Sequence, residues 1–200
     1  MIRKERTLAI MKPDAVQRSL IGEILRRYER SGLKLVAMKM LIPTPEMATE
    51  HYMVGGEEWL ENVGKKAAAA YEKKGQQSPF KTFRENGMAI LQSNAKYLSS
   101  GPVILMVWEG NQAVGIVRKI TGGTEPLSSD VGTIRGDLTV DSYQLADVDS
   151  RSIRNLIHAS GDPGEAEKEI LIWFRPEELL SYRHIQEAIL YDVNLDGILE

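Results

Sequence analysis

The chain has 200 residues, of which 42% are hydrophobic and 26% charged, so it is long and apolar enough for one globular domain. It has no cysteine, which excludes disulfides and thiolate metal sites, and its formal net charge of −3 disfavours a general nucleic-acid binder. No segment approaches the roughly 20 apolar residues of a membrane-spanning helix, and the first apolar run is too short for a signal peptide. We therefore expect a cytoplasmic protein that binds neither membranes nor nucleic acid.

The first strand and helix follow from apolar spacing. Residues 7–11, TLAIM, predict a buried strand that ends before Pro13. Residues 19–32 predict a helix, because apolar side chains recur at helical spacing between Ile21 and Tyr28 and a glycine follows them.

A second strand and a short helix come next. Residues 33–42 predict the strand, with Leu33, Leu35 and Ala37 on one face. Residues 45–52 predict the helix, because a proline stands at its first position.

The segment 53–98 has a different composition. It is slightly basic within an acidic chain, and four alanines at 67–70 between lysines favour helix. It holds too few apolar residues for a core of its own. We predict a helical insertion at 53–98 within a single domain over residues 1–200.

The second half predicts a central strand, a helix, another strand, a polar loop and two helices, over residues 102–108, 111–123, 132–140, 142–152, 162–174 and 176–192. The first of these is continuously apolar, as a strand buried on both faces requires. The helix at 162–174 opens with an acid-proline pair typical of a capped start. The order of elements predicts an α+β fold with a ferredoxin-like βαββαβ core, a four-stranded antiparallel sheet and helices on one face.

Basic residues lie at the ends of several elements. The sequence has no phosphate-binding GxxxxGK[ST] loop and no GxGxxG motif. It does have cations near element ends, namely Lys12, Arg118, Lys119, Arg135 and Arg154. Each one alone is most often a solvated surface charge, but together they would stabilise phosphate.

His158 is one of three histidines and has two interpretations. It is either a packing residue at a strand end or a nucleophile, since a neutral imidazole nitrogen can attack. A nucleophilic imidazole needs its second nitrogen held, and Glu165 or Glu169 could do so from the next helix. His51 and His184 show no metal-ligand spacing with it.

Several motifs together resemble the nucleoside diphosphate kinase family. They cover both halves of the core in order, and NxxHxS followed by EKEI is highly specific. The matching stretches are RTLAIMKPDAVQR (6–18), IGEIL (21–25), EHY (50–52), SGPVILMVWEG (100–110), VRKITGGTEP (117–126), GTIRGD (132–137), RNLIHAS (154–160) and EAEKEILIWFRPEEL (165–179).

The resemblance implies a ping-pong enzyme. The γ-phosphoryl of ATP or another nucleoside triphosphate would pass to a histidine and then to a nucleoside diphosphate. The implied roles are nucleophile for His158, its orientation for Glu169, phosphate binding for Lys12, Arg118, Thr124 and Arg135, ribose binding for Asn155 with Lys12, and a wall near the phosphates for Tyr52. Mg²⁺ would arrive on the nucleotide, with no protein metal ligands, and the protein would form a homo-hexamer or homo-tetramer.

The chain departs from the family pattern where the base should bind. The segment 53–98 is enlarged, so the stacking aromatic is one of Trp59, Phe80 and Phe83, with Trp59 nearest to the expected place. The loop at 141–152 is also longer, and the opposing apolar residue is not clearly preserved.

The family's HGSD pattern reads HASGD here, which moves its acid to Asp162. The enlarged segment also favours a second hypothesis, a weakly active member that serves as an oligomeric nucleotide-binding scaffold or regulator.

Overall fold

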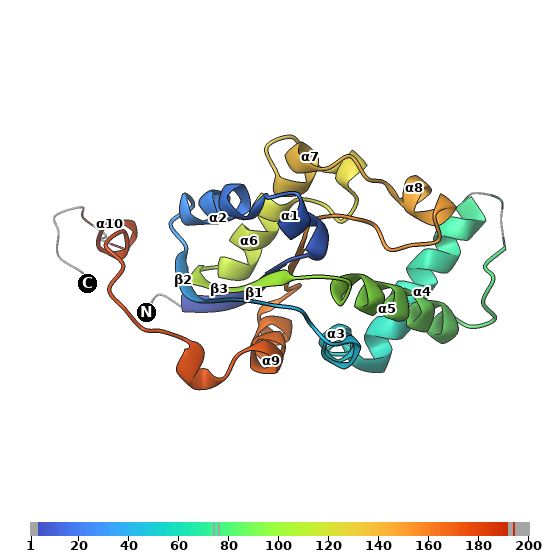
Figure 1. The fold of residues 1–200 in the computed structure, drawn as a ribbon, viewed down its shortest axis with the longest axis horizontal. Coiled ribbons are helices and arrows are strands. Elements are labelled where there is room, and N and C mark those ends of the chain that lie inside the picture. Colours follow the sequence, from blue (N-terminus) through green and yellow to red (C-terminus); the bar gives the residue numbers. More distant parts are fainter. Residues whose placement is uncertain (1–3, 74, 76, 192–193, 195–200) are drawn as a thin grey trace.

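The computed structural model describes residues 4–73, 75, 77–191 and 194. Four strands form one antiparallel sheet in the order β2-β3-β1-β4, which confirms the ferredoxin-like α+β fold. Helices cover both faces of the sheet (Figure 1), so the prediction of helices on one face is wrong. The central strands are apolar on both faces, and each face needs a cover.

The two central strands carry the core. β1 (Lys4–Met11) pairs with β3 (Val103–Asn111), and Leu8 lies opposite Val107. Along β1, Leu8 and Ile10 face one apolar cluster, whereas Ala9 and Met11 face the other. This alternation follows from the two-residue period of a strand.

Helices α2 (Ile21–Glu29) and α6 (Ala113–Thr121) pack on one face of the sheet. Tyr28 of α2 is fully buried there and contacts the ring of Trp108 at 5.5 Å between centroids. The short helix α1 (Pro13–Gln17) precedes them and starts directly after β1. Each of these helices has an apolar stripe, and these stripes bury this face of the sheet.

Helices α3 (Pro45–Tyr52) and α9 (Pro163–Trp173) cover the opposite face. The side chain of Asp162 accepts a hydrogen bond from the backbone N–H of Glu165, so the predicted cap of α9 is confirmed.

The edge strand β2 (Lys34–Leu41) departs from its predicted pattern. Its pairing with β3 shifts register between Leu35 and Ala37. Leu33 and Leu35 therefore join one apolar cluster and Ala37 the other, although the sequence predicted one common face. A bulge adds one residue to a strand and moves the following side chains to the opposite face.

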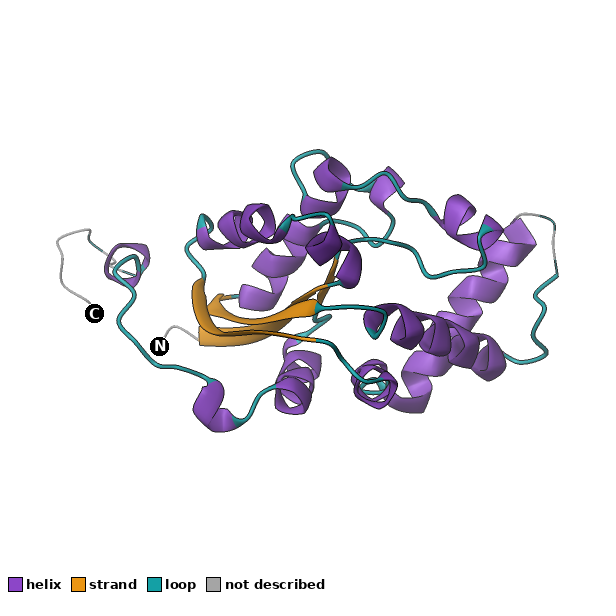
Figure 2. Ribbon diagram, viewed as in Figure 1, coloured by secondary structure: helices purple, strands orange, loops and turns teal. Residues whose placement is uncertain are grey.

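Two packed helices occupy most of the described part of the segment 53–98 (Figure 2), in line with the helical character predicted from its composition. These are α4 (Gly56–Lys73) and α5 (Phe83–Leu98). Gly64 and Gly87 allow their backbones to touch, because a Cβ at Gly64 would lie 1.8 Å from the carbonyl oxygen of Phe83.

Two predicted elements in the second half are wrong. Residues 132–140 form no strand; α7 (Ile134–Leu138) occupies them, because the side chain of Thr133 caps a helix by accepting from Gly136 N–H. The predicted loop at 142–152 contains α8 (Tyr143–Val148), which Ser142 caps in the same way. The fourth strand is β4 (Ile157–Ala159), which contains His158.

The predicted helix over 176–192 is also largely wrong within the described residues. Only two short helical pieces form there, η2 (Pro176–Glu178) and α10 (Glu187–Leu190). Between them Leu180 N–H donates to Val36 O at 2.8 Å, and the Tyr182 hydroxyl donates to Leu35 O at 2.8 Å. One further short piece, η1 (Pro126–Ser128), precedes α7. None of the helices in the described part of the chain is both long and apolar enough to cross a membrane.

Candidate active site

A strained turn leads into the strand that carries His158. Leu156 is fully buried and has φ 66°, and the N–H of Ile157 donates to Asn155 O at 2.7 Å. A hydrogen bond over two residues with a left-handed central residue is a γ-turn, which costs about 1–3 kcal/mol for a side chain of this size. β4 then starts at once and pairs His158 with Ile10 of β1. The turn therefore fixes where the imidazole enters the site.

Contacts from other elements hold this turn in place. The Leu156 N–H donates to Asp14 Oδ2 of α1 at 3.1 Å, and the Lys12 N–H donates to Leu156 O at 2.8 Å. Both neighbours follow β1 directly, so the end of β1 and the start of β4 brace each other. Strain of this kind persists only where the surroundings over-determine it.

Arg135 joins three segments of the site. Its guanidinium donates four hydrogen bonds to backbone carbonyls, those of Gly122, Gly123, Asn155 and Ile157. Burial lowers the pKa of Arg135 to about 10, so the group stays charged at neutral pH. Arg135 thus positions the loops around His158 and also adds a buried positive charge beside them.

Lys12, Asn155 and Thr124 form a hydrogen-bonded chain. Lys12 Nζ donates to Asn155 Oδ1 at 2.8 Å, and Asn155 Nδ2 donates to Thr124 O at 2.8 Å. Burial, followed by the charge of Arg135, lowers the pKa of Lys12 to about 7. Three of the predicted phosphate and ribose ligands therefore lie together, although they come from separate parts of the chain.

The imidazole of His158 is held by one of the two predicted carboxylates. His158 Nε2 lies 2.8 Å from Glu169 Oε1, and Ser160 Oγ donates to Glu169 Oε2 at 2.6 Å. Glu165 instead accepts the N–H of Gly161. A carboxylate can only accept, so Nε2 carries the ring proton and Nδ1 keeps a lone pair.

Burial and the nearby cations keep this imidazole uncharged. Burial first and then the charge of Lys12 lower the pKa of His158 to about 3. Burial raises the pKa of Glu169. A neutral imidazole with a free nitrogen is a competent nucleophile at neutral pH.

A second histidine touches the first. His51, at the end of α3, is fully buried, and its ring lies edge-on to His158 with centroids 4.4 Å apart. Trp173 Nε1 donates to His51 Nδ1 at 3.3 Å. The neighbouring Tyr52 ring is 6.4 Å from the His158 ring, and burial raises the pKa of its phenol. The sequence interpretation missed His51, although its place beside Tyr52 was a signal.

The family follows from comparison with known proteins. The family model described as nucleoside diphosphate kinase matches residues 5–59 and 58–179. The chain belongs to the nucleoside diphosphate kinase family. This confirms the resemblance and the enzyme class predicted from the motifs.

Relatives and solved structures agree with this family. A nucleoside diphosphate kinase of Pyrobaculum aerophilum is 48% identical over 180 residues, which is 88% of this chain and 98% of that protein. A crystal structure of an NDP kinase from the same organism has a TM-score of 0.86 at 45% identity and covers 90% of this chain and 100% of that one. A structure of the nucleoside-diphosphate kinase from Borrelia burgdorferi, a transition state mimic with bound vanadate and ADP, has a TM-score of 0.76 at 36% identity. The match covers 93% of this chain and 96% of that one.

Two further residues were predicted to bind the nucleotide, Arg118 and Trp59, and the structure brings only Arg118 close to the other site residues. Arg118 lies in the last turn of α6, and its positive charge helps lower the pKa of His158, which puts it among the basic residues of the site. Trp59 is half-buried at the start of α4, against Gly55. No hydrogen bond or ring contact of the described residues joins Trp59 to His158, and Phe80 and Phe83 are exposed.

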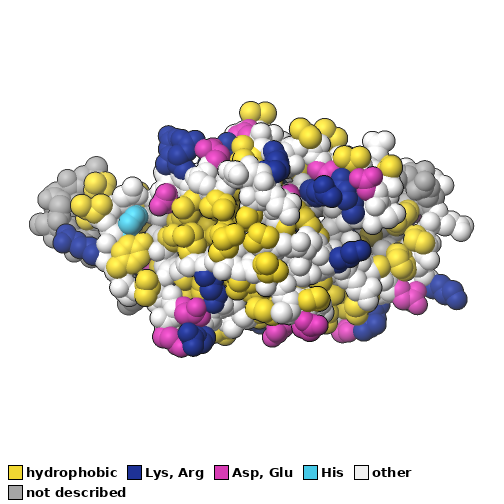
Figure 3. All heavy atoms as spheres, viewed as in Figure 1, with side chains coloured by type: hydrophobic (Ala, Val, Ile, Leu, Met, Phe, Trp, Pro, Cys, Tyr) yellow, Lys and Arg dark blue, Asp and Glu magenta, His cyan; other side chains and the backbone are white. Residues whose placement is uncertain are grey.

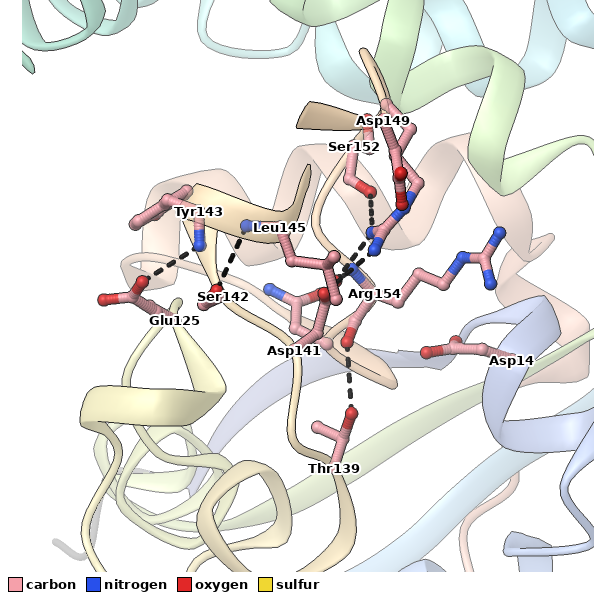
Figure 4. A network of polar contacts seen from close by, with 12 residues as sticks. Asp14, Glu125, Thr139, Asp141, Ser142, Tyr143, Leu145, Asp149, Ser152 and Arg154 are labelled. Carbon is pink, nitrogen blue, oxygen red and sulfur yellow. Dashed lines mark hydrogen bonds and ion pairs between the residues drawn. The ribbon is translucent and has the colours of Figure 1, made fainter. Parts of the chain in front are cut away.

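A polar network ties the long loop of this family member to the site. Arg151 binds both carboxylate oxygens of Asp141, at 2.7 and 3.0 Å. The Arg154 N–H donates to Asp141 as well (Figure 4). Burial alone would raise the pKa of Asp141, but the bonds from Arg151 and Arg154 lower it. Ser152 reaches across and donates to Asn94 Oδ1 of α5 at 2.8 Å. The loop before Asn155 is therefore braced from two sides.

Proposed function

We propose that this chain moves the γ-phosphoryl group of a nucleoside triphosphate to a nucleoside diphosphate through a phosphohistidine at His158. One observation carries this proposal. Glu169 engages His158 Nε2, which leaves the Nδ1 lone pair available in a neutral ring. The charges of Lys12 and Arg118 act on the same ring.

Each half-reaction balances without a further reactant. Nδ1 attacks the γ-phosphorus, an N–P bond forms, and the bond to the β-phosphate oxygen breaks, so that a nucleoside diphosphate leaves. A second diphosphate then attacks the phosphohistidine and restores the neutral ring. Glu169 stabilises the positive charge that develops on the imidazole. Phosphoryl transfer depends mainly on such positioning and charge stabilisation.

The remaining residues have proposed binding roles. Lys12, Arg118, Arg135 and Thr124 would bind phosphate oxygens, Asn155 and Lys12 the ribose, and Tyr52 would line the site near the phosphates. Mg²⁺ would enter bound to the nucleotide as part of the substrate. Trp59 remains the proposed stacking aromatic, with Phe80 and Phe83 as alternatives.

Labelling with ATP tests the mechanism directly. ATP labelled in its terminal phosphate should label the protein at His158, through a bond that is labile in acid and stable in alkali. Wild-type protein without label, or equal label after His158→Ala, would contradict the proposal. Such a result would favour the second hypothesis, a scaffold or regulator that uses the α4–α5 pair to contact other molecules.

We also propose that the chain forms a homo-oligomer, a hexamer or a tetramer. Among the described residues no further strand pairs with the outer edge of β2, although Leu180 and Tyr182 bond to its first residues. Beyond that contact, Met38 and Met40 of β2 are 50% and 57% exposed. Figure 3 shows hydrophobic side chains gathered over this part of the sheet. Exposed apolar side chains on an edge strand are typical of a subunit contact. Sedimentation of the wild type and of Met40→Lys would test this: a smaller species is expected for the variant.

The cytoplasmic location remains a prediction, which cell fractionation would check.

A further inference from the structure

Three side chains of the types that bind transition metals meet in the interior beside the nucleophile. One donor atom from each of His51, His158 and Glu169 lies within 4.8 Å of the others. Among the described residues, these form the one cluster of three or more His, Cys, Asp or Glu side chains that could hold an ion. His51 and His158 are far apart in sequence, so no metal-ligand spacing motif predicts the cluster.

The donor distances suit a small ion after minor adjustment. Glu169 Oε1 lies 2.8 Å from His158 Nε2 and 3.7 Å from His51 Nδ1. A tetrahedral zinc-type ion bonds such donors at roughly 2.0–2.2 Å and so holds them about 3.4 Å apart. The first separation must widen by about 0.6 Å and the second must close by about 0.3 Å, while His51 and His158 already place their donor atoms within 4.8 Å of each other.

The donors are also in a suitable chemical state. His51 Nδ1 accepts a long hydrogen bond from Trp173, so it carries no proton, and an ion can replace that weak contact. Ser160 donates a hydrogen bond to the other oxygen of Glu169 and so fixes the orientation of the carboxylate. Carboxylates that bind metals are commonly oriented by a hydrogen bond of this kind. The side chain of His158 is 17% exposed, which provides a path of entry.

We propose that His51, His158 and Glu169 bind a borderline transition-metal ion such as Zn²⁺ or Co²⁺, and that the bound ion blocks phosphorylation of His158. Two imidazoles and one carboxylate are a common set of protein ligands for zinc, with the fourth position open to water. Mg²⁺ does not suit the set, because it prefers six oxygen ligands. The blocking part of this proposal rests on the proposed function.

The block follows from where the ring proton must go. The ion takes the lone pair of His158 Nε2, and the proton that this atom carried moves to Nδ1. The ring stays neutral and no proton is released, but Nδ1 no longer has a lone pair with which to attack phosphorus. The positive charges of Lys12, Arg118 and Arg135 oppose the ion, so we expect reversible binding that is weaker than in a structural zinc site.

Binding is tested first, without nucleotide. Metal-free full-length protein is titrated with Co²⁺, and the visible absorption of protein-bound Co²⁺ is recorded. We expect one ion per chain for the wild type and for the control His184→Asn, and at least about tenfold weaker binding for His51→Asn. Equal binding by all three proteins, or none by the wild type, overturns the site. If circular dichroism shows that His51→Asn is unfolded, Glu169→Gln serves in its place with the same expectation.

The block is tested second, by labelling. Protein loaded with one equivalent of Zn²⁺ and freed of excess metal receives a short pulse of labelled MgATP. Label at His158 should fall at least tenfold in the wild type and in His184→Asn, whereas His51→Asn should label equally with and without zinc. Undiminished label on metal-loaded wild type overturns the block. Failure of the metal-free wild type to label contradicts the proposed function instead and leaves the Co²⁺ result standing.

Discussion

His158 Nε2 lies 2.8 Å from Glu169 Oε1, and this contact decides which ring nitrogen can react. The carboxylate keeps the proton on Nε2 and the lone pair on Nδ1. The same carboxylate is itself held by Ser160, so the orientation of the imidazole depends on a chain of two hydrogen bonds. Loss of either bond would leave the ring free to turn or to change tautomer.

Replacement of Glu169 should therefore slow phosphorylation rather than weaken nucleotide binding. In Glu169→Gln, the amide NH₂ can donate to Nε2 and move the ring proton to Nδ1. We expect the rate of His158 phosphorylation to fall about 100-fold in single-turnover measurements, with little change in the nucleotide Kd. Glu165→Gln is the matched control, because Glu165 contacts Gly161 and not the ring. An equal loss in both variants would contradict this role.

Lys12 should produce a basic limb in the pH profile. Its pKa of about 7 means that free enzyme loses this positive charge as the pH rises through 7. Since kcat/KM reports the free enzyme, we expect it to fall up to about tenfold per pH unit above 7. Lys12→Arg keeps its charge throughout, so its profile should stay flat at a lower absolute value. Parallel profiles for the two proteins would show that Lys12 does not titrate in this range.

The sheet was predictable from sequence, but the strand that carries His158 was not. β1 and β3 are long apolar runs, whereas β4 has three residues and exists only through its pairing with β1 and the turn at Leu156. Residues 132–140 had a strand-like pattern, yet the Thr133 cap gives a helix there. The local pattern of apolar and polar residues does not predict a strand that forms only because it pairs with a strand distant in sequence.

The candidate site shows the same limit. The motif around His158 predicted its pairing with Glu169, but the contact with His51 joins α3 to β4 across the fold. The four carbonyl groups that accept hydrogen bonds from Arg135 could not be predicted either, because every residue has a backbone carbonyl and the sequence does not indicate which ones Arg135 reaches. Convergence of this kind is set by topology.

The buried His51 should make the protein sensitive to acid. Burial, then the charge of His158, lowers the pKa of His51 to about 3, whereas an unfolded histidine titrates near 6.5. Below pH 6.5 the unfolded state gains a proton at His51 that the native state does not, so His51 alone should lower the free energy of unfolding by up to about 1.4 kcal/mol per pH unit down to pH 3. His158, whose pKa is also lowered to about 3, should add a similar slope. Urea unfolding in chelator from pH 7.5 to 4.5 checks this slope. His51→Gln should lose stability less steeply over that range, and an equal slope in both proteins would contradict the assignment.

Contact between α4 and α5 should depend on Gly87. A Cβ at this position would lie 2.1 Å from Leu60 O, and the helices would have to separate. Separation also breaks the bond from Asn86 Nδ2 to Gly64 O. We expect Gly87→Ala to lower the free energy of unfolding by about 1–3 kcal/mol. Gly22→Ala in α2 is the control, because a Cβ there meets nothing within 4 Å and the change should stabilise the protein by at most about 1 kcal/mol.

Since α5 also contacts Ser152 of the loop before Asn155, the nucleotide KM should rise in Gly87→Ala alone. An unchanged KM in a destabilised variant would show that the α4–α5 pair is independent of the nucleotide site.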